Sequence, residues 1–379
     1  MRVARDPAAR RRLAALCAVA AVSAVAGAVS GADGGAGEAE SNSAGAPADS
    51  AAAELPLARA VGQLLVMSYD GTEPPAYIRR RLRRGEGTGV ILFAKNAPDA
   101  SSLAASTAAL QRAAGDGALV ATDQEGGDIR SVGFAGPEPS QGATTTPDAA
   151  GQAAADAARA LREVGINVNL APVADVASGP ASVVAGRAYG SAAPEVPALV
   201  AASVRAHAGE RVAATVKHFP GLGAAGANTD DEPVTIATSR EQIEDSDLPP
   251  FRAAIDEDVP LVMSSHALYP ALDAARIASQ SSAVLEDLLR GELGFRGAVV
   301  TDSIEAQAVL ARSDVAEAAV RSVQAGADLA LMTGSGSWSL VYPALLERAQ
   351  HDPAFAARVR EAAARVAALK RRLGLRPAG

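Results

Sequence analysis

The sequence has few cysteines, few aromatic residues and no excess of positive charge, and each shortage excludes a class of protein. The single cysteine in 379 residues cannot form an intrachain disulfide. Aromatic residues amount to 3%, which argues against a stacking groove lined by aromatic rings. The net charge of −8 gives no footprint for nucleic acid or an anionic membrane, so we expect no nucleic-acid partner. The 49% of hydrophobic residues is nevertheless enough to bury a large core.

The amino-terminal residues predict an export segment. Five arginines within residues 1–12 precede an apolar run from Leu13 to about Val29, which is the pattern of a signal sequence. We expect residues 1–31 to be a cleaved signal peptide; an uncleaved membrane anchor and a lipoprotein signal are the second and third interpretations. Cys17 lies inside the apolar run and would be removed with the signal. The protein should be exported, either secreted or at the cell surface, with a possible N-terminal anchor as its only membrane contact.

A disordered linker is expected at residues 32–54, where Gly, Ala and Ser dominate without periodicity. From there on, short apolar runs alternate with Ala-, Leu-, Arg- and Glu-rich stretches of helical length. Most of the apolar runs lack polar alternation, as parallel strands buried on both faces do. The runs are Gln63–Tyr69, Gly89–Ala94, Ala118–Thr122, Ile166–Val173, Val212–Lys217, Pro260–Ser264, Gly297–Thr301 and Ala327–Met332. The helical stretches include Ala76–Arg84, Ser101–Ala114, Asp148–Val164, Ser282–Leu293 and Ser313–Ala325.

Eight strands, each followed by a helix, predict an α/β protein with a single (β/α)8 TIM barrel over residues 55–375. A doubly wound open sheet is the structural alternative, which periodicity alone does not exclude. The Gly-rich phosphate fingerprint of a dinucleotide-binding sheet is missing after the first strand, and this disfavours the open sheet.

Polar residues follow the predicted strands at the point where each strand ends. They are Asp123, Glu125, Asp175, Lys217, His218, His266 and Asp302, with Arg187 in the loop after the fourth strand. Active sites of barrels lie at the carboxyl ends of the strands. Charge at the end of a buried strand is costly unless it is paired or binds a ligand. Lys217 and His218 are adjacent, so a regular strand would send them to opposite faces, and both can touch one ligand only if the backbone kinks.

Seven motifs in one order resemble glycoside hydrolase family 3, in particular its short bacterial β-N-acetylglucosaminidases, over residues Leu57 to Leu373. The motifs are Gly89–Asn96, Asp123–Gly127, Gly165–Val173 with Asp175, Lys217–Gly221, Met263–His266, Leu289–Phe295 and Thr301–Asp302. The resemblance implies a retaining exo-β-glycosidase that hydrolyses terminal β-N-acetylhexosamine of peptidoglycan- or chitin-derived glycans. It implies no metal and no organic cofactor, because two carboxyl groups and water suffice. We expect a monomer whose partner is its carbohydrate substrate.

The resemblance also assigns roles to residues. Asp302 would be the nucleophile, held by a rigid strand beneath the anomeric carbon; as a structural alternative, it would cap the helix that follows. Family members bind the non-reducing sugar through residues that correspond here to Asp123, Arg187, Lys217 and His218. His266 would line the same pocket, or would be a structural histidine bonded to the backbone.

The general acid/base departs from the family pattern. Short family members carry it as a histidine on the loop after the Lys-His-Phe-Pro-Gly motif, but the loop Leu222–Glu232 contains no histidine, and Asp230 occupies that position. Three interpretations follow. Asp230, Asp231 or Glu232 protonates the leaving oxygen; or the loop is a solvated acidic turn and the enzyme is weak; or the barrel binds glycan without cleaving it.

Two further consequences concern the substrate. The family often has an arginine where this chain has Ser131, with Arg130 one place earlier, so one contact is unassigned. A β-glucosidase or β-xylosidase on the same barrel is therefore the rival enzyme activity, and a scaffold without sugar binding is a remote alternative. An anionic aspartate would repel phosphate by about 1 kcal/mol or more at contact distance, so we predict hydrolysis rather than phosphorolysis.

Overall fold

The computed structural model describes residues 55–190 and 194–377. The predicted export segment at 1–31 and linker at 32–54 lie outside these ranges, and the predicted domain boundaries remain predictions. In the described part of the chain, every helix is too short or too polar to cross a membrane.

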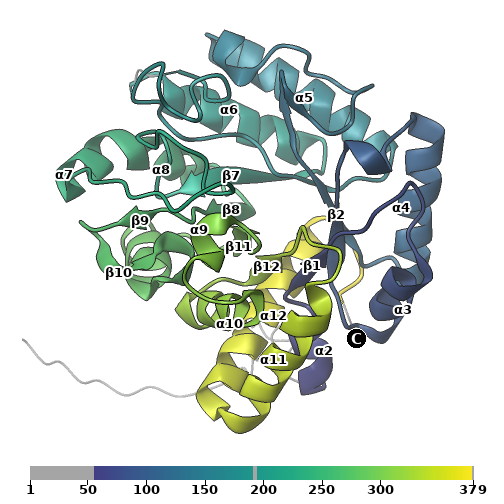
Figure 1. The fold of residues 1–379 in the computed structure, drawn as a ribbon. Coiled ribbons are helices and arrows are strands. Elements are labelled where there is room, and N and C mark those ends of the chain that lie inside the picture. The colour runs from purple at the N-terminus through teal and green to yellow at the C-terminus, as the bar shows by residue number, and fades with distance from the viewer. Residues whose placement is uncertain (1–54, 191–193, 378–379) are drawn as a thin grey trace, which may run out of the picture. The chain divides into compact units, whose positions relative to one another are not determined.

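Eight parallel strands form a closed barrel (Figure 1), as the sequence predicts. Each predicted apolar run overlaps one of them, with β7 and β11 extending two residues beyond their runs, and the order around the barrel is β1-β12-β11-β8-β7-β6-β3-β2. The strands are β1 Leu65–Met67, β2 Gly89–Leu92, β3 Leu119–Thr122, β6 Val168–Asn169, β7 Ala213–Phe219, β8 Leu261–Ser264, β11 Ala298–Ser303 and β12 Leu329–Leu331. The open-sheet alternative is thereby wrong.

Helical segments follow the strands along the chain, and local capping explains several of their starts. Asp99 accepts a hydrogen bond from the Ser102 amide at the start of α4 (Ala100–Ala114). Thr146 accepts one from the Ala149 amide at the start of α5 (Pro147–Glu163), where Pro147 occupies the first turn. The longer helices are α2 Leu57–Gly62, α3 Ala76–Arg84, α4 Ala100–Ala114, α5 Pro147–Glu163, α6 Val196–Gly209, α8 Leu248–Asp256, α10 Val315–Ala325, α11 Trp338–His351 and α12 Pro353–Arg372. Shorter or irregular segments are η1 Ala94–Asn96, η2 Gln141–Ala143, α7 Arg240–Gln242, η3 Ile243–Asp247, η4 Ala278–Gln280, η5 Ala283–Glu292 and α9 Gln307–Leu310.

Two small antiparallel hairpins, absent from the prediction, lie in loops that follow barrel strands. One pairs β4 (Gln124–Gly126) with β5 (Ile129–Arg130), directly after β3. The other pairs β9 (Leu268–Tyr269) with β10 (Asp273–Ile277), after β8. Both therefore belong to the set of loops that follow the carboxyl ends of the strands.

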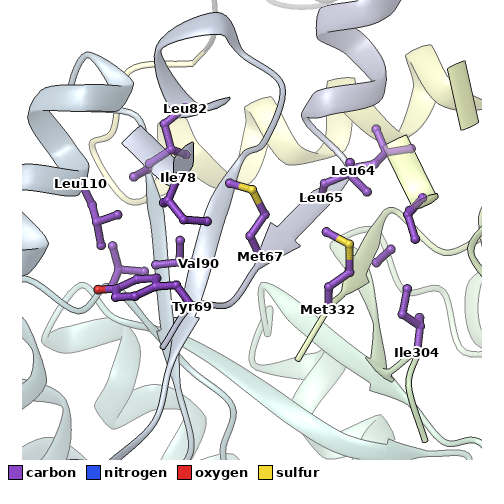
Figure 2. Packing of buried hydrophobic residues seen from close by; sticks show 14 of the residues in the cluster. Leu64, Leu65, Met67, Tyr69, Ile78, Leu82, Val90, Leu110, Ile304 and Met332 are labelled. Atoms are coloured by element: carbon purple, nitrogen blue, oxygen red, sulfur yellow. The ribbon is translucent and has the colours of Figure 1, made fainter. Parts of the chain in front are cut away.

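Hydrophobic side chains fill both sides of the barrel wall. A cluster outside the first strands joins β1, α3 and α4 to β12, and Figure 2 labels Met67, Ile78, Leu110 and Met332 among its members. A separate cluster takes one or two residues from every barrel strand, and these are spaced by two where a strand gives a pair. Because strand side chains alternate between faces, this second cluster forms the interior of the barrel.

Candidate active site

Side chains alternate between the two faces of each barrel strand, and this alternation places the polar residues at the carboxyl end of the barrel interior. Ala298 and Val300 of β11 point inward, so the next residue of that parity is Asp302. Ala121 of β3 also points inward, and the next residue of the same parity is Asp123. Together with Lys217, these carboxyl groups line a cavity of about 440 Å³. The apolar part of its wall comes from the uppermost interior residues, Ile91, Leu170, Met263 and Leu331.

Lys217 lies between two carboxylates. Its Nζ is 2.6 Å from Asp123 Oδ1 and 2.6 Å from Glu125 Oε1. Arg187 binds Glu125 through two parallel contacts, Nε to Oε2 at 2.9 Å and Nη2 to Oε1 at 2.7 Å. Burial alone would raise the pKa of Glu125, but Lys217 and Arg187 lower it to about 2. The cluster is thus a set of acceptors and donors that hold one another in place along one side of the cavity.

His218 reaches the same cavity as Lys217 because the strand is irregular there. The Lys217–His218 peptide bond is cis, and the pairing of β7 with β8 shifts register between Val216 and Phe219. The backbone irregularity that two adjacent residues need in order to face one cavity is therefore present. The His218 Nδ1 lies 2.7 Å from Asp175 Oδ2, and the His218 amide donates to Asp175 Oδ1 at 3.0 Å. Asp175, which is buried, thus fixes the imidazole orientation.

Asp302 lies across the cavity from Asp123, since β11 and β3 are opposite each other in the barrel order, whereas Lys217 on β7 is two strands from β11. Its Oδ1 accepts a 2.8 Å hydrogen bond from the Ser303 amide, and its Oδ2 is 3.9 Å from His218 Nε2. Burial alone would raise the pKa of Asp302, but His218, His266 and the Ser303 amide lower it overall. The carboxyl group is therefore held as an anion in one orientation.

His266 matches its structural alternative and not the predicted sugar contact. Its Nδ1 lies 2.7 Å from Ser279 Oγ, and its Nε2 lies 2.9 Å from the Ser303 carbonyl oxygen. Both ring nitrogens are used, the residue is buried, and it is not among the residues that line the cavity. Through its contact with the Ser303 carbonyl oxygen, it supports the end of β11 next to Asp302 without lining the cavity.

The acidic loop after β7 brings one of the three candidate acids to the cavity. Asp230 lines it, together with Asn228, whereas Asp231 and Glu232 do not. The carbonyl oxygens of Thr229 and Asp230 accept hydrogen bonds from the amides of Ala308 and Gln307, each at 3.1 Å. Although Asp230 is exposed in its loop, desolvation of its carboxyl group against the protein and then the charge of Asp302 raise its pKa.

Several lining residues were not predicted from the sequence. Phe93 and Thr333 stand two positions after the interior residues Ile91 and Leu331, so strand parity could have found them. Ser303 and Glu305 also line the cavity. Glu305 Oε2 accepts from the Thr333 amide at 2.9 Å, and from the hydroxyl groups of Ser303 and Thr333.

The chemical resources of this cavity are carboxyl groups and two fixed cations. The five acids that line it are Asp123, Glu125, Asp230, Asp302 and Glu305, and the cations are Arg187 and Lys217. In residues 55–190 and 194–377, no group of three or more His, Cys, Asp or Glu side chains is arranged to hold a metal ion. A carboxylate held as an anion near a carboxyl group of raised pKa suits covalent displacement with general acid assistance.

Comparisons with known proteins point to one family. Residues 57–369 match the "Glycosyl hydrolase family 3 N terminal domain". The chain is 37% identical over 293 residues to an uncharacterized secreted glycosyl hydrolase of Arthroderma benhamiae, which covers 74% of this chain and 83% of that relative. A solved family 3 β-N-acetylglucosaminidase from Paenibacillus sp. is 35% identical, with a TM-score of 0.80 over 84% of this chain and 63% of that one. A solved β-N-acetylhexosaminidase from Beutenbergia cavernae is 32% identical, with a TM-score of 0.76 over 84% of this chain and 99% of that one.

Proposed function

Because this chain belongs to glycoside hydrolase family 3 and is a hydrolase of the β-N-acetylhexosaminidase-like type, we propose that it removes terminal β-N-acetylhexosamine with retention of configuration. The observation that carries this proposal is the shared cavity: Asp302 from β11 lines it together with Lys217 and His218 from β7 and Asp123 after β3. A nucleophile and a set of sugar-binding groups therefore converge on one space.

In the proposed first step, the Asp302 carboxylate attacks the anomeric carbon while Asp230 donates its proton to the glycosidic oxygen. The carbon–oxygen bond to the leaving group breaks, and an ester forms between the sugar and Asp302. In the second step, Asp230, now a carboxylate, takes a proton from water. That water attacks the anomeric carbon, the ester breaks, and Asp302 is regenerated. The lowered pKa of Asp302 and the raised pKa of Asp230 support this division of labour.

Recognition of the terminal sugar is assigned to Asp123, Lys217, Arg187 and His218. The ammonium and guanidinium groups can donate to sugar hydroxyls, and Asp123 can accept from them. Their mutual ion pairs support this role, because they fix the positions of donors and acceptors before the sugar arrives. We also propose that the protein is exported, as its arginine-rich, apolar N-terminus and its secreted fungal relative suggest, and that it acts as a monomer.

The test is covalent trapping with a fluorinated N-acetylglucosaminyl reagent, followed by peptide mass analysis. We expect one sugar per chain on the peptide that contains Asp302. The Asp302→Asn variant should take up no label, and Asp287→Asn, which removes an acid outside the cavity, should be labelled like the unmodified protein. Label on another carboxyl group, or turnover with inversion of the anomeric centre in a nuclear magnetic resonance time course, would exclude the proposed mechanism.

A further inference from the structure

The charges of the candidate active site are unevenly compensated. On the side of β3 and β7, Lys217 and Arg187 pair with Asp123 and Glu125. On the side of β11 and the acidic loop stand Asp302, Glu305 and Asp230. Across residues 55–190 and 194–377, none of these three forms an ion pair with a lysine or an arginine. Asp230 carries a proton at the start of the proposed reaction, so Asp302 and Glu305 are the acids that matter for charge on this side. The cavity therefore has one wall of paired acids and bases, and one acidic wall whose carboxyl groups have no lysine or arginine partner among the described residues.

Glu305 is the acid in this wall that the proposed reaction does not use. The Thr333 amide, at 2.9 Å from Oε2, and two hydroxyl groups hold its carboxyl group in place. Its Oε1 is buried and has no hydrogen-bond partner among the described residues. Hydrogen bonds from neutral donors fix a carboxylate without cancelling its charge. An acid without a lysine or arginine partner among the described residues consequently lies in the wall of a confined space, where charges interact more strongly than in water.

We propose that this acidic wall makes the enzyme select its substrates by charge, with Glu305 as a specificity-determining residue. Saccharides whose leaving sugar carries a free amino group are favoured over neutral ones, and leaving sugars that carry a carboxylate are disfavoured. The substrate class is then partly N-deacetylated chitin fragments, and not fragments in which the leaving sugar is a muramic acid. This inference rests on the proposed function, because it concerns the sugar released by that reaction.

The test compares three disaccharides with the same terminal N-acetylglucosamine, in which the leaving sugar is glucosamine, N-acetylglucosamine or N-acetylmuramic acid. Values of kcat/KM are measured at about pH 6, where the amine is protonated. We expect the amine substrate to exceed the carboxylate substrate by about tenfold or more. In Glu305→Gln, which keeps the shape of the side chain, this ratio should fall by about tenfold. The matched control is Glu241→Gln on the exposed surface of α7, which changes the net charge equally and should keep the ratio.

A wild-type ratio below one, or a ratio that Glu305→Gln leaves unchanged, would overturn the inference. If Glu305→Gln does not fold, the wild-type ratio is measured against salt: a charge preference must shrink as ionic strength rises, and one that does not shrink refutes it. Absence of any cleavage, including of an aryl β-N-acetylglucosaminide, would instead refute the proposed function. Binding of the three disaccharides, measured by calorimetry, then decides the charge preference by its order.

Discussion

Replacing Lys217 by methionine should destabilise the protein far more than the loss of an ordinary surface lysine. The Lys217 side chain is only 3% exposed, and its Nζ is 2.6 Å from both Asp123 and Glu125. Methionine fills most of the same volume but leaves the buried Glu125 carboxylate with Arg187 as its only cationic partner among the described residues. Removing one partner of a buried ion pair typically costs about 3–5 kcal/mol, because the remaining charge stays buried.

The lowered pKa of Glu125 gives an independent value for the stability that its ion pairs contribute. It is lowered from 4.5 to about 2, which corresponds to about 3 kcal/mol of stability at neutral pH. The side chain is 1% exposed, so solvent screens it little. Because the folded-state pKa is the lower one, this stability is complete above about pH 4.5 and is lost as the pH falls through about 2. The charge of Lys217 is the largest single cause that lowers it, so much of this contribution should vanish in the variant.

The assay is denaturant unfolding of Lys217→Met, with Lys95→Met as its matched control. Lys95 also pairs with an aspartate, Asp70, but both side chains are about half exposed or more. The control should lose less than about 1 kcal/mol, whereas Lys217→Met should lose about 3 kcal/mol at neutral pH and show a shallower loss between about pH 4.5 and 2. Equal unfolding free energies for the two variants at neutral pH would refute the reasoning.

Three further predictions concern catalysis. Asp302→Asn should lower kcat on an aryl β-N-acetylglucosaminide by at least about 10³-fold with an unchanged circular dichroism spectrum, and full activity would remove the mechanism. The pH profile of kcat/KM should be bell-shaped, since activity is lost as the pH falls through the lowered pKa of Asp302 and as it rises through the raised pKa of Asp230. Asp230→Asn should abolish the alkaline limb while Asp231→Asn keeps it, and the reverse would make Asp231 the acid. In phosphate buffer the product should be the free amino sugar, and a glycosyl phosphate as main product would contradict the assignment of an anionic residue to this position.

Strand periodicity was enough to predict eight buried parallel strands and the polar residues at their carboxyl ends, and the missing phosphate fingerprint favoured a barrel over an open sheet. The runs around Leu119 and Val300 are apolar on both faces, as parallel strands buried on both faces are. Counting by two from these interior residues reaches Asp123 and Asp302. The same counting reaches Phe93 and Thr333, which the sequence analysis passed over because a phenylalanine and a threonine carry no charge to mark them.

Features that depend on loops could not be predicted in the same way. Glu305 follows β11 by two residues, in a segment with no periodicity, and its direction is fixed by hydrogen bonds that include the amide of Thr333 in another loop. The positions of His218 and His266 were likewise open. His218 reaches the cavity because its strand is irregular. His266 is held outside the cavity lining by its contacts with Ser279 and the Ser303 carbonyl oxygen. These outcomes depend on contacts between segments far apart in sequence.

The choice among the three acidic residues after β7 shows how such contacts bear on the mechanism. Asp230, Asp231 and Glu232 are chemically interchangeable in the sequence, and only Asp230 lines the cavity. The loop is held there by the amides of Gln307 and Ala308, which belong to the segment that begins with Asp302. One short stretch of chain thus supplies the proposed nucleophile, the acid Glu305 and the two donors that position the proposed general acid. If Asp230 serves as that acid, its place beside the nucleophile follows from this shared segment, and the charge of Asp302 that raises its pKa is a consequence of the same arrangement.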